Sequence, residues 1–529
     1  MTRSFVTYSV RAGAIGALLL LSWVPQACTN LDETPSSAIT PGNFYRNQGE
    51  VLAGLAGVYS ELKNTLWGYY NLSEISSDEI IVPTRGSDWY DNGRWLEIHR
   101  QLWGASSPSG LEDLNGAWSD AYTGVARANA LLEAMQKVTV PGQDTIAAEA
   151  RTLRAYYYYQ LMDLFGGVPI VTTNDYKPHP RATRAELFQF IVSELTAARA
   201  DLPATWDDAN RGRMTKGAPA AILANMYLNA AVFTKDVGID ATGYNSCLTV
   251  PVGGGTACDA ALAWVDSILN SGLYLLEDSF PKAFRATNHA SKENIFVVKN
   301  LASDGLGLNF VMRALHYNQF TPAPWNGFAT AADVYNAFDA ADARRGIFLI
   351  GQQYDLSSGT PGDSVKDRVG AWLVFTDTIG DATSARENEG PRLLKWPPDT
   401  KHVGPDNGND FAYFRLGEIY LIKAEAEFEN GNSAQAIIDL NYLRARDFNP
   451  DQDLVAVDHT VLLNERMFEL TGETKRRQDL IRFGLYTAAR PIDDIAAHNL
   501  PVRDPTRVLM AIPQTQMDAN PLLKQNAGY

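Results

Sequence analysis

The side chains best suited to chemistry are aromatic and planar polar residues in two loop-like segments, residues 83–95 and 321–328. Both segments are rich in Pro, Gly, Asn and Asp, which favour turns. Sugars present flat C–H faces rimmed by hydroxyl groups, so a site for them needs aromatic rings beside directed hydrogen-bonding groups. The sequence therefore predicts a ligand-binding surface with these candidate residues: Trp89, Asp91, Arg94, Trp325 and Asn326.

The tryptophans also have a purely structural interpretation. Trp89, and Trp95 in the same segment, could pin the loop to neighbouring helices instead of contacting a ligand. Trp67 and Trp103 lie near apolar helical runs, so we predict that they belong to the core. The sequence leaves both roles open for the loop tryptophans.

Acidic and basic residues also recur at helical spacing near the C-terminus. Glu465, Glu469 and Glu473 are four residues apart, with Arg466 and Arg476 among them. Ion pairs along and between helices explain this spacing, and no nucleophile or metal ligand accompanies it. The seven histidines are scattered and no Cys-x-x-Cys occurs. We therefore expect no catalytic residue, no metal site and no cofactor.

Helical periodicity dominates much of the chain and recurs as helix, turn, helix. The predicted pairs are residues 117–137 with 144–165, 184–201 with 216–233, and 416–429 with 433–446. Pairs of about 34 residues with alanine at the contacts suggest tetratricopeptide-like repeats. Tyr156 to Tyr159 point all round one of these helices, so most of them are predicted to be core. Asn225 and Asn229 favour a buried helix over a membrane span for the nearly apolar residues 217–233.

Residues 280–410 have a different texture, in which Gly, Pro, Asn and aromatic residues interrupt short apolar runs. Residues 295–298 and 372–375 are the clearest candidates for short strands. We predict a mainly α protein with a helical scaffold and a loop-rich, irregular part. Binding residues are usually carried by such loops on a rigid scaffold.

The N-terminus looks like an export signal. Its apolar run, residues 12–24, is too short for a membrane span, which needs roughly 20 helical residues. The four residues that end at Cys28 resemble the lipobox of bacterial lipoproteins, although Pro25 stands where that motif prefers Leu. We predict a signal at residues 1–27, lipidation of Cys28 and a polar tether after it. The alternative is an ordinary signal peptide followed by a structural cysteine.

Two further cysteines, Cys247 and Cys258, bracket a loop rich in Pro and Gly. In an oxidising compartment cysteines this close in sequence favour a disulfide. Two free thiols are the alternative.

The net charge of −16 is spread without a basic stripe, and loss of residues 1–27 makes the chain more acidic still. A field of this sign repels polyphosphate. Nucleic acid is therefore set aside as a partner.

Four separated stretches together resemble the SusD/RagB family of outer-membrane nutrient-binding lipoproteins. They are CTNLDETP at residues 28–35 with GVY at 57–59, RAYY at 154–157 leading to FGGVP at 165–169, RLGEIYLIKAEA at 415–426, and the spaced residues Glu465, Arg466, Glu469, Leu470, Glu473, Arg476, Asp479, Leu480 and Arg482. The departures are Thr474, where the family often has Gly, and Ala527, where its closing motif often has Pro.

The resemblance implies an N-terminal helical region at residues 28–240 and a C-terminal region at 280–529 that carries ligand-binding loops. It implies a lipid-anchored protein at the outer-membrane surface, acting as a lid on a SusC-like TonB-dependent transporter. The expected function is non-catalytic capture of an oligosaccharide or related nutrient and its delivery to that transporter. A surface glycoside hydrolase and a helical-repeat assembly scaffold without a small ligand are the alternatives.

Overall fold

A computed structural model of the chain describes residues 44–174, 177–493, 498 and 500–529. The predicted signal at residues 1–27, Cys28 and its tether lie outside these residues. Residues Tyr45–Tyr529 form one compact unit. The division of the sequence into residues 28–240 and 280–529 stays a prediction.

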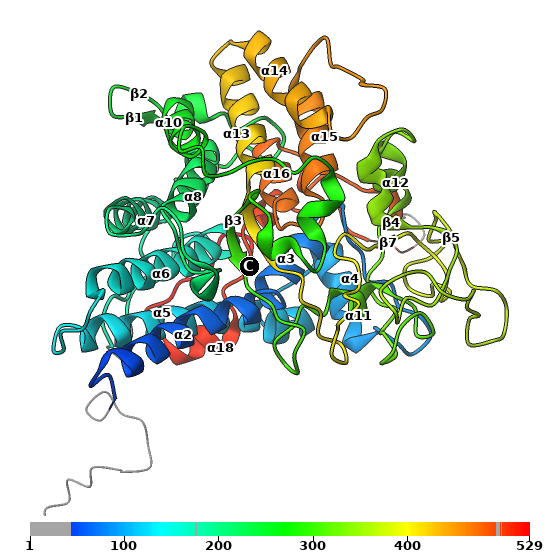
Figure 1. The fold of residues 1–529 in the computed structure, drawn as a ribbon, viewed down its shortest axis with the longest axis horizontal. Coiled ribbons are helices and arrows are strands. Elements are labelled where there is room, and N and C mark those ends of the chain that lie inside the picture. The colour runs from blue at the N-terminus through cyan, green and yellow to red at the C-terminus, as the bar shows by residue number, and fades with distance from the viewer. Residues whose placement is uncertain (1–43, 175–176, 494–497, 499) are drawn as a thin grey trace, which may run out of the picture. The chain divides into compact units, whose positions relative to one another are not determined.

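The described residues are mainly helical, which confirms the predicted fold class (Figure 1). The helices are α2 (Gln48–Thr65), α3 (Gly68–Ile75), α4 (Arg94–His99), α5 (Asn115–Ala134), α6 (Gln143–Phe165), α7 (Arg184–Arg199), α8 (Gly217–Leu228), α9 (Ala230–Phe233), α10 (Ala257–Leu269), α11 (Phe310–Ala314), α12 (Ala332–Ala337), α13 (Leu416–Glu429), α14 (Ser433–Arg444), α15 (His459–Leu470), α16 (Arg476–Arg482) and α18 (Gln514–Ala519).

Successive long helices pack side by side. Helix α2 contacts α5, and the series continues through α6, α7, α8, α10, α13 and α14, each in contact with the next (Figure 1). The pairs α5–α6, α7–α8 and α13–α14 are the predicted helix pairs. This helical array forms the scaffold of the molecule.

Helix α6 contributes four consecutive tyrosines to the core of the helical array. The four tyrosines Tyr156, Tyr157, Tyr158 and Tyr159 are each at most 1% exposed, which confirms their assignment to the core. Their hydroxyl groups find partners within the fold: Tyr157 donates to the carbonyl of Val58 at 2.6 Å. A buried tyrosine needs such a partner for its hydroxyl.

The predicted helix at residues 216–233 divides into α8 and α9 at Asn229. Helix α8 is almost entirely buried, and Tyr159 donates to Asn225 at 2.8 Å. Asn229 accepts from the guanidinium of Arg482 at 2.6 Å, which ties the break to the closing helices. Within the described part of the chain, no helix combines the length and apolar character that crossing a membrane requires.

Strands are short and occur as antiparallel pairs in the described residues. They are β1 (Pro251–Val252) with β2 (Gly255–Thr256), β3 (Asn294–Val298) with β8 (Phe411–Arg415), β4 (Phe348–Leu349) with β7 (Arg392–Leu393), and β5 (Gly351–Gln352) with β6 (Val374–Phe375). The pair β3–β8 packs on α6 through Phe296, whose ring centroid lies 4.7 Å from that of Tyr156. Residues 280–410 are otherwise loops and short helices, as predicted.

The structure joins Cys247 and Cys258 in a disulfide. The intervening segment contains the small hairpin β1–β2, and Cys258 lies in the first turn of α10. The bond therefore fastens this hairpin to the start of a scaffold helix.

The acids and bases near the C-terminus form ion pairs inside the core. Arg415, at the end of β8, lies 2.7 Å from Glu293, 2.6 Å from Glu469 and 2.7 Å from Glu473. These four side chains are at most 3% exposed. The pairs join elements far apart in sequence, in agreement with the prediction of ion pairs between helices as well as along them. Loss of one partner from a buried pair costs about 3–5 kcal/mol, because it strands the other charge.

Candidate ligand-binding site

Tight turns shape the first predicted binding loop, residues 83–95. Trp89, Asp91 and Asn92 all have positive φ angles, of 63°, 39° and 57°. Positive φ is uncommon outside glycine and marks a constrained backbone. The buried guanidinium of Arg85 holds the base of the loop by donating to the carbonyls of Arg386 and Glu389.

Trp89 joins this loop to the second one. Its indole Nε1 donates to the carbonyl of Trp325 at 2.6 Å, and its ring packs edge to face on Trp95 and Phe328, with centroids 5.4 and 5.8 Å away. The ring lies so close to Gly327 that a Cβ there would be 2.4 Å from it. Trp89 thus has the pinning role that the sequence left open, and it pins loop to loop.

Trp325 and Trp67 form an aromatic edge beside Trp89. Their ring centroids are 6.4 Å apart with planes at 77°. Trp67 is 38% exposed, so its assignment to the core was wrong, whereas Trp95 and Trp103 are buried as core residues are. Trp67 follows α2 at a helix junction, where its ring lies under the guanidinium of Arg313 at 4.8 Å. The apolar helical run that suggested burial ends before it.

The other predicted residues differ in what they can reach. Asn326 is buried, and its side chain donates to the carbonyl of Glu387 and accepts from Arg392, both at 3.0 Å. It supports the second loop from within. The side chain of Asp91 is half-exposed and accepts from the indole of Trp95 at 2.7 Å.

Arg94 is directed to neighbouring acids. Its guanidinium bonds Glu112, lies 3.6 Å from Asp113 and stacks 4.4 Å from the ring of Trp95. The structure therefore places Trp89, Trp325 and Asn326 together, while Arg94 ties the first loop to the turn before α5.

A polar cluster that the sequence did not reveal lies next to Trp89. Tyr317 donates to the carboxylate of Asp88 at 2.6 Å, and Arg368 donates to the same oxygen at 3.1 Å. Arg368 also bonds Glu387, which pairs with His316 at 3.0 Å. The guanidinium of Arg368 lies 4.1 Å from the ring centroid of Tyr317 and remains about half-exposed. Four segments distant in sequence meet here.

The cluster is fixed in a defined protonation state near neutral pH. Burial alone raises the pKa of Glu387, but hydrogen bonds from His316 and Arg368 outweigh it and lower that pKa below its ordinary value. Burial lowers the pKa of His316 despite its contact with Glu387. Burial and the bond to Asp88 raise the pKa of Tyr317 to about 12. The site thus offers a charged carboxylate, a neutral imidazole and a phenol.

Exposed aromatic residues lie in the same loops as the cluster. Tyr90 in the first loop and Trp372 are each 58% exposed. Trp372 is paired with Lys366 across the hairpin of residues 366–372, which also carries Arg368. We call the following residues the loop site: Trp67, Asp88, Trp89, Tyr90, Tyr317, Trp325, Arg368, Trp372 and Glu387.

The loop site combines aromatic rings with a charge-assisted hydrogen-bonding cluster. Such surfaces suit ligands that are flat and apolar on one face and rich in hydroxyl groups at the edge. No group of three or more potential ligands that could hold a metal ion occurs among the described residues. Sequence spacing could not locate Tyr317 or Arg368, because each stands alone in a loop and only the fold brings it to Asp88.

Two family models match the chain. A model described as the SusD family matches residues 302–529, and one described as starch-binding and associating with the outer membrane matches residues 59–228. The second model spans α2 to α8, and the first spans most of the loop-rich part and the closing helices. The two matches therefore cover residues of both the helical array and the loop-rich part.

Relatives resemble the chain along most of its length. A SusD-like protein P25 of Formosa agariphila is 23% identical, covering 94% of this chain and 96% of the relative. The starch-binding protein SusD of Bacteroides thetaiotaomicron is 26% identical, covering 87% of this chain and 85% of the relative. Among solved structures, a surface glycan-binding protein A of Bacteroides thetaiotaomicron in complex with laminarihexaose has a TM-score of 0.70 at 20% identity, covering 91% and 99% of the two chains. This last likeness shows the fold.

Proposed function

We propose that this chain, which belongs to the SusD family, is a non-catalytic binding protein. It captures an oligosaccharide at the loop site and delivers it to a TonB-dependent transporter. The bound ligand is a glycan fragment with exposed hydroxyl groups. The relative named as a starch-binding protein and the neighbour solved with laminarihexaose support a glycan as the ligand.

The observation that carries the proposal is the junction of Trp89 and Trp325 beside the Asp88–Arg368–Glu387 cluster. The indole of Trp89 is already bonded to the carbonyl of Trp325, and that bond holds both loops in place before a ligand arrives. Preorganised groups bind more tightly because less conformational entropy is lost on binding. A ligand therefore meets aromatic rings and charged hydrogen-bonding groups that are already in position.

The choice of partner and location rests on the family and on the N-terminal sequence. One matching model describes association with the outer membrane. A lipid at Cys28 would anchor the protein there, with the polar residues after it as a tether. We propose that the transporter lies beneath the anchored protein and receives the glycan from the loop site.

A glycan array probed with the protein lacking residues 1–27 tests the binding function. We expect the protein to be retained on at least one class of glycan. Trp325→Ala and Trp372→Ala should each lower the affinity for that glycan at least tenfold, which corresponds to about 1.4 kcal/mol of binding free energy. Trp264→Ala is the matched control, since Trp264 is half-buried like Trp325 but lies on α10, outside the loop site. Equal retention by the loop variants and the control would contradict the proposal.

A glycoside hydrolase remains the second candidate because two carboxylates meet at one arginine. Asp88 and Glu387 both contact Arg368. Hydrolysis needs one carboxyl group protonated as a general acid, whereas the pKa of Glu387 is lowered. Incubation of the protein with its array ligand should release no new reducing ends; steady release that is lost in Glu387→Gln would favour the hydrolase.

A further inference from the structure

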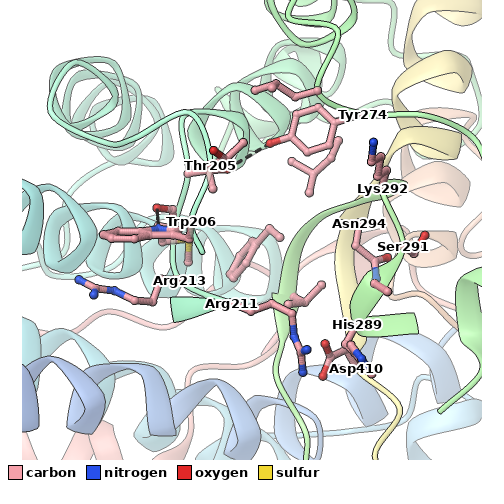
Figure 2. Close-up of a pocket in the computed structure, with 18 of the residues that line it drawn as sticks. Thr205, Trp206, Arg211, Arg213, Tyr274, His289, Ser291, Lys292, Asn294 and Asp410 are labelled. Atoms are coloured by element: carbon pink, nitrogen blue, oxygen red, sulfur yellow. Dashed lines mark hydrogen bonds between the residues drawn. The ribbon is translucent and has the colours of Figure 1, made fainter. Parts of the chain in front are cut away.

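A separate pocket of about 440 Å³ opens where the helical array meets the β3–β8 pair (Figure 2). Its walls come from the segment between α7 and α8, from the residues after α10, and from the segments at β3 and before β8. Ligand pockets commonly have volumes of about 300–1,000 Å³. The pocket shares no lining residue with the loop site.

One wall of the pocket is aromatic and held in place. Trp206 donates its indole N–H to the carbonyl of Met214 at 2.9 Å, and the guanidinium of Arg213 lies 4.0 Å from its ring centroid. Arg213 is in turn bound by the buried carboxylate of Glu149, with Nε 3.1 Å from it. Tyr274 lines another side and shares a hydrogen bond of 3.1 Å with Thr215 (Figure 2). Both aromatic side chains are therefore positioned without a ligand.

The facing wall carries hydrogen-bond acceptors that the described residues leave unused. Asp410 is 1% exposed; its Oδ1 accepts from the amide of Asn300 at 2.8 Å, and its Oδ2 accepts no hydrogen bond from the described residues. Asn294 donates to the carbonyl of Asn288 at 3.0 Å, while its buried Oδ1 has no donor. A buried acceptor without a donor costs about 1–3 kcal/mol. Both side chains line the pocket (Figure 2).

The charged groups around the pocket leave a small excess of negative charge. Arg211 and Lys292 stand on the lining beside the carboxylates of Asp207, Asp208 and Asp410, while Glu149 neutralises Arg213. Burial raises the pKa of Asp410, although the Asn300 amide and nearby Arg211 lower it in part. The excess of one carboxylate therefore disfavours an anionic ligand.

We propose that this pocket is a second binding site, which takes one or two rings of a neutral carbohydrate. The ring of Trp206 covers an apolar face of the sugar, and hydroxyl groups donate to Asp410 and to Asn294. A hydroxyl-rich ligand supplies the donors that the two acceptors lack, and its apolar face matches the indole.

Fluorine NMR of protein labelled with 5-fluorotryptophan tests the second site directly. The probes are the neutral disaccharides laminaribiose, maltose, cellobiose and xylobiose, with galacturonic acid as the charged comparison. The Trp206 resonance is identified as the one that is missing from the spectrum of Trp206→Phe. We expect at least one neutral disaccharide to shift this resonance saturably. The resonance of Trp264 on α10 should not move, and Trp325→Ala should leave the Trp206 shift unchanged even if the loop site fails to bind.

Asp410→Asn tests the role of the Asp410 carboxylate more specifically, because asparagine has nearly the same shape as aspartate. Its remaining carbonyl oxygen can still accept from Asn300, while an amide NH₂ replaces the free acceptor oxygen. We expect the disaccharide affinity at Trp206 to fall at least tenfold while the melting temperature and loop-site binding are retained. The proposal is overturned if no neutral disaccharide shifts Trp206, if galacturonic acid alone does so, or if Asp410→Asn binds as well as the unaltered protein.

Discussion

At the scale of single residues, Gly327 lies so close to Trp89 of the loop site that there is no room for a side chain. A Cβ at Gly327 would lie 2.4 Å from the Trp89 ring, which is held by its bond to Trp325. Gly327→Ala should therefore lower the free energy of unfolding by about 1–3 kcal/mol through overpacking. It should also weaken glycan binding, because Trp89 must move.

Urea denaturation and calorimetry with the array ligand check this prediction together. Gly346→Ala is the matched control, since nothing lies within 4 Å of a Cβ at that exposed position. Full stability and full affinity in Gly327→Ala would show that Trp89 does not need its observed position.

Single residues were also the hardest to predict from the sequence. Trp89 and Trp325 could be singled out because aromatic residues in turn-rich loops are conspicuous. Arg368 and Tyr317 could not, because their partners Asp88 and Glu387 are distant in sequence. Asn326 looked available for a ligand, yet the fold uses both ends of its amide internally.

At the scale of elements, the contact between α5 and α6 depends on one small residue. A Cβ at Gly124 would lie 2.4 Å from the ring of Tyr157, whose hydroxyl is fixed on the carbonyl of Val58. Gly124→Ala gains up to about 1 kcal/mol of helix propensity. Overpacking costs about 1–3 kcal/mol, so the net effect should be destabilising.

The control for this prediction lies on the same helix. A Cβ at Gly116 meets nothing within 4 Å, so Gly116→Ala should be neutral or slightly stabilising in thermal unfolding. If Gly124→Ala melted at or above the temperature of Gly116→Ala, the close packing of α5 on α6 would be refuted.

Elements were predicted more completely than sites. Helix α13 begins and ends where its periodicity indicated, and the ends of α6 and α14 differ by one or two residues. The break between α8 and α9 escaped prediction because it depends on Asn229 meeting Arg482, a tertiary contact with no local signal.

At the scale of the whole molecule, a buried pair of carboxyl groups links the N-terminal helices to the closing ones. Glu74 in α3 accepts from the amide of Thr474, and nearby Glu79 accepts from that of Gly472 at 2.9 Å. Burial, and then the charge of Glu79, raises the pKa of Glu74. The folded protein therefore keeps a proton that the unfolded chain releases above its ordinary glutamate pKa.

The sign of the pH dependence follows from that difference. A raised pKa in the folded state means that the stabilising contribution is lost as pH rises above the ordinary glutamate value and through the folded one. Glu74→Gln mimics the protonated form at every pH. Its melting temperature relative to the unaltered protein should rise as the pH increases above the ordinary glutamate pKa.

Differential scanning calorimetry at several pH values measures this trend. Glu133→Gln on α5 controls for loss of a carboxylate elsewhere on the scaffold. A relative melting temperature of Glu74→Gln that stayed constant or fell with rising pH would contradict a protonated Glu74 in the folded protein.

The proposed lipid anchor concerns the whole chain and rests on the sequence before the described residues. Cys28→Ser should release the protein from membranes into the soluble fraction, because a lipoprotein cysteine carries the acyl chains that hold it there. Membrane fractionation of cells that express either form, with Cys247→Ser as the control for loss of a cysteine, measures this. Persistent membrane association of Cys28→Ser would overturn the lipid anchor.

A crystal structure with the strongest array ligand tests most directly whether the loop site holds the glycan. We expect density for sugar rings against Trp89 and Trp325, with hydroxyl groups on Arg368 or Asp88, whether or not the second pocket is also filled. A well-ordered glycan bound elsewhere, with the loop site empty, would contradict glycan binding at the loop site.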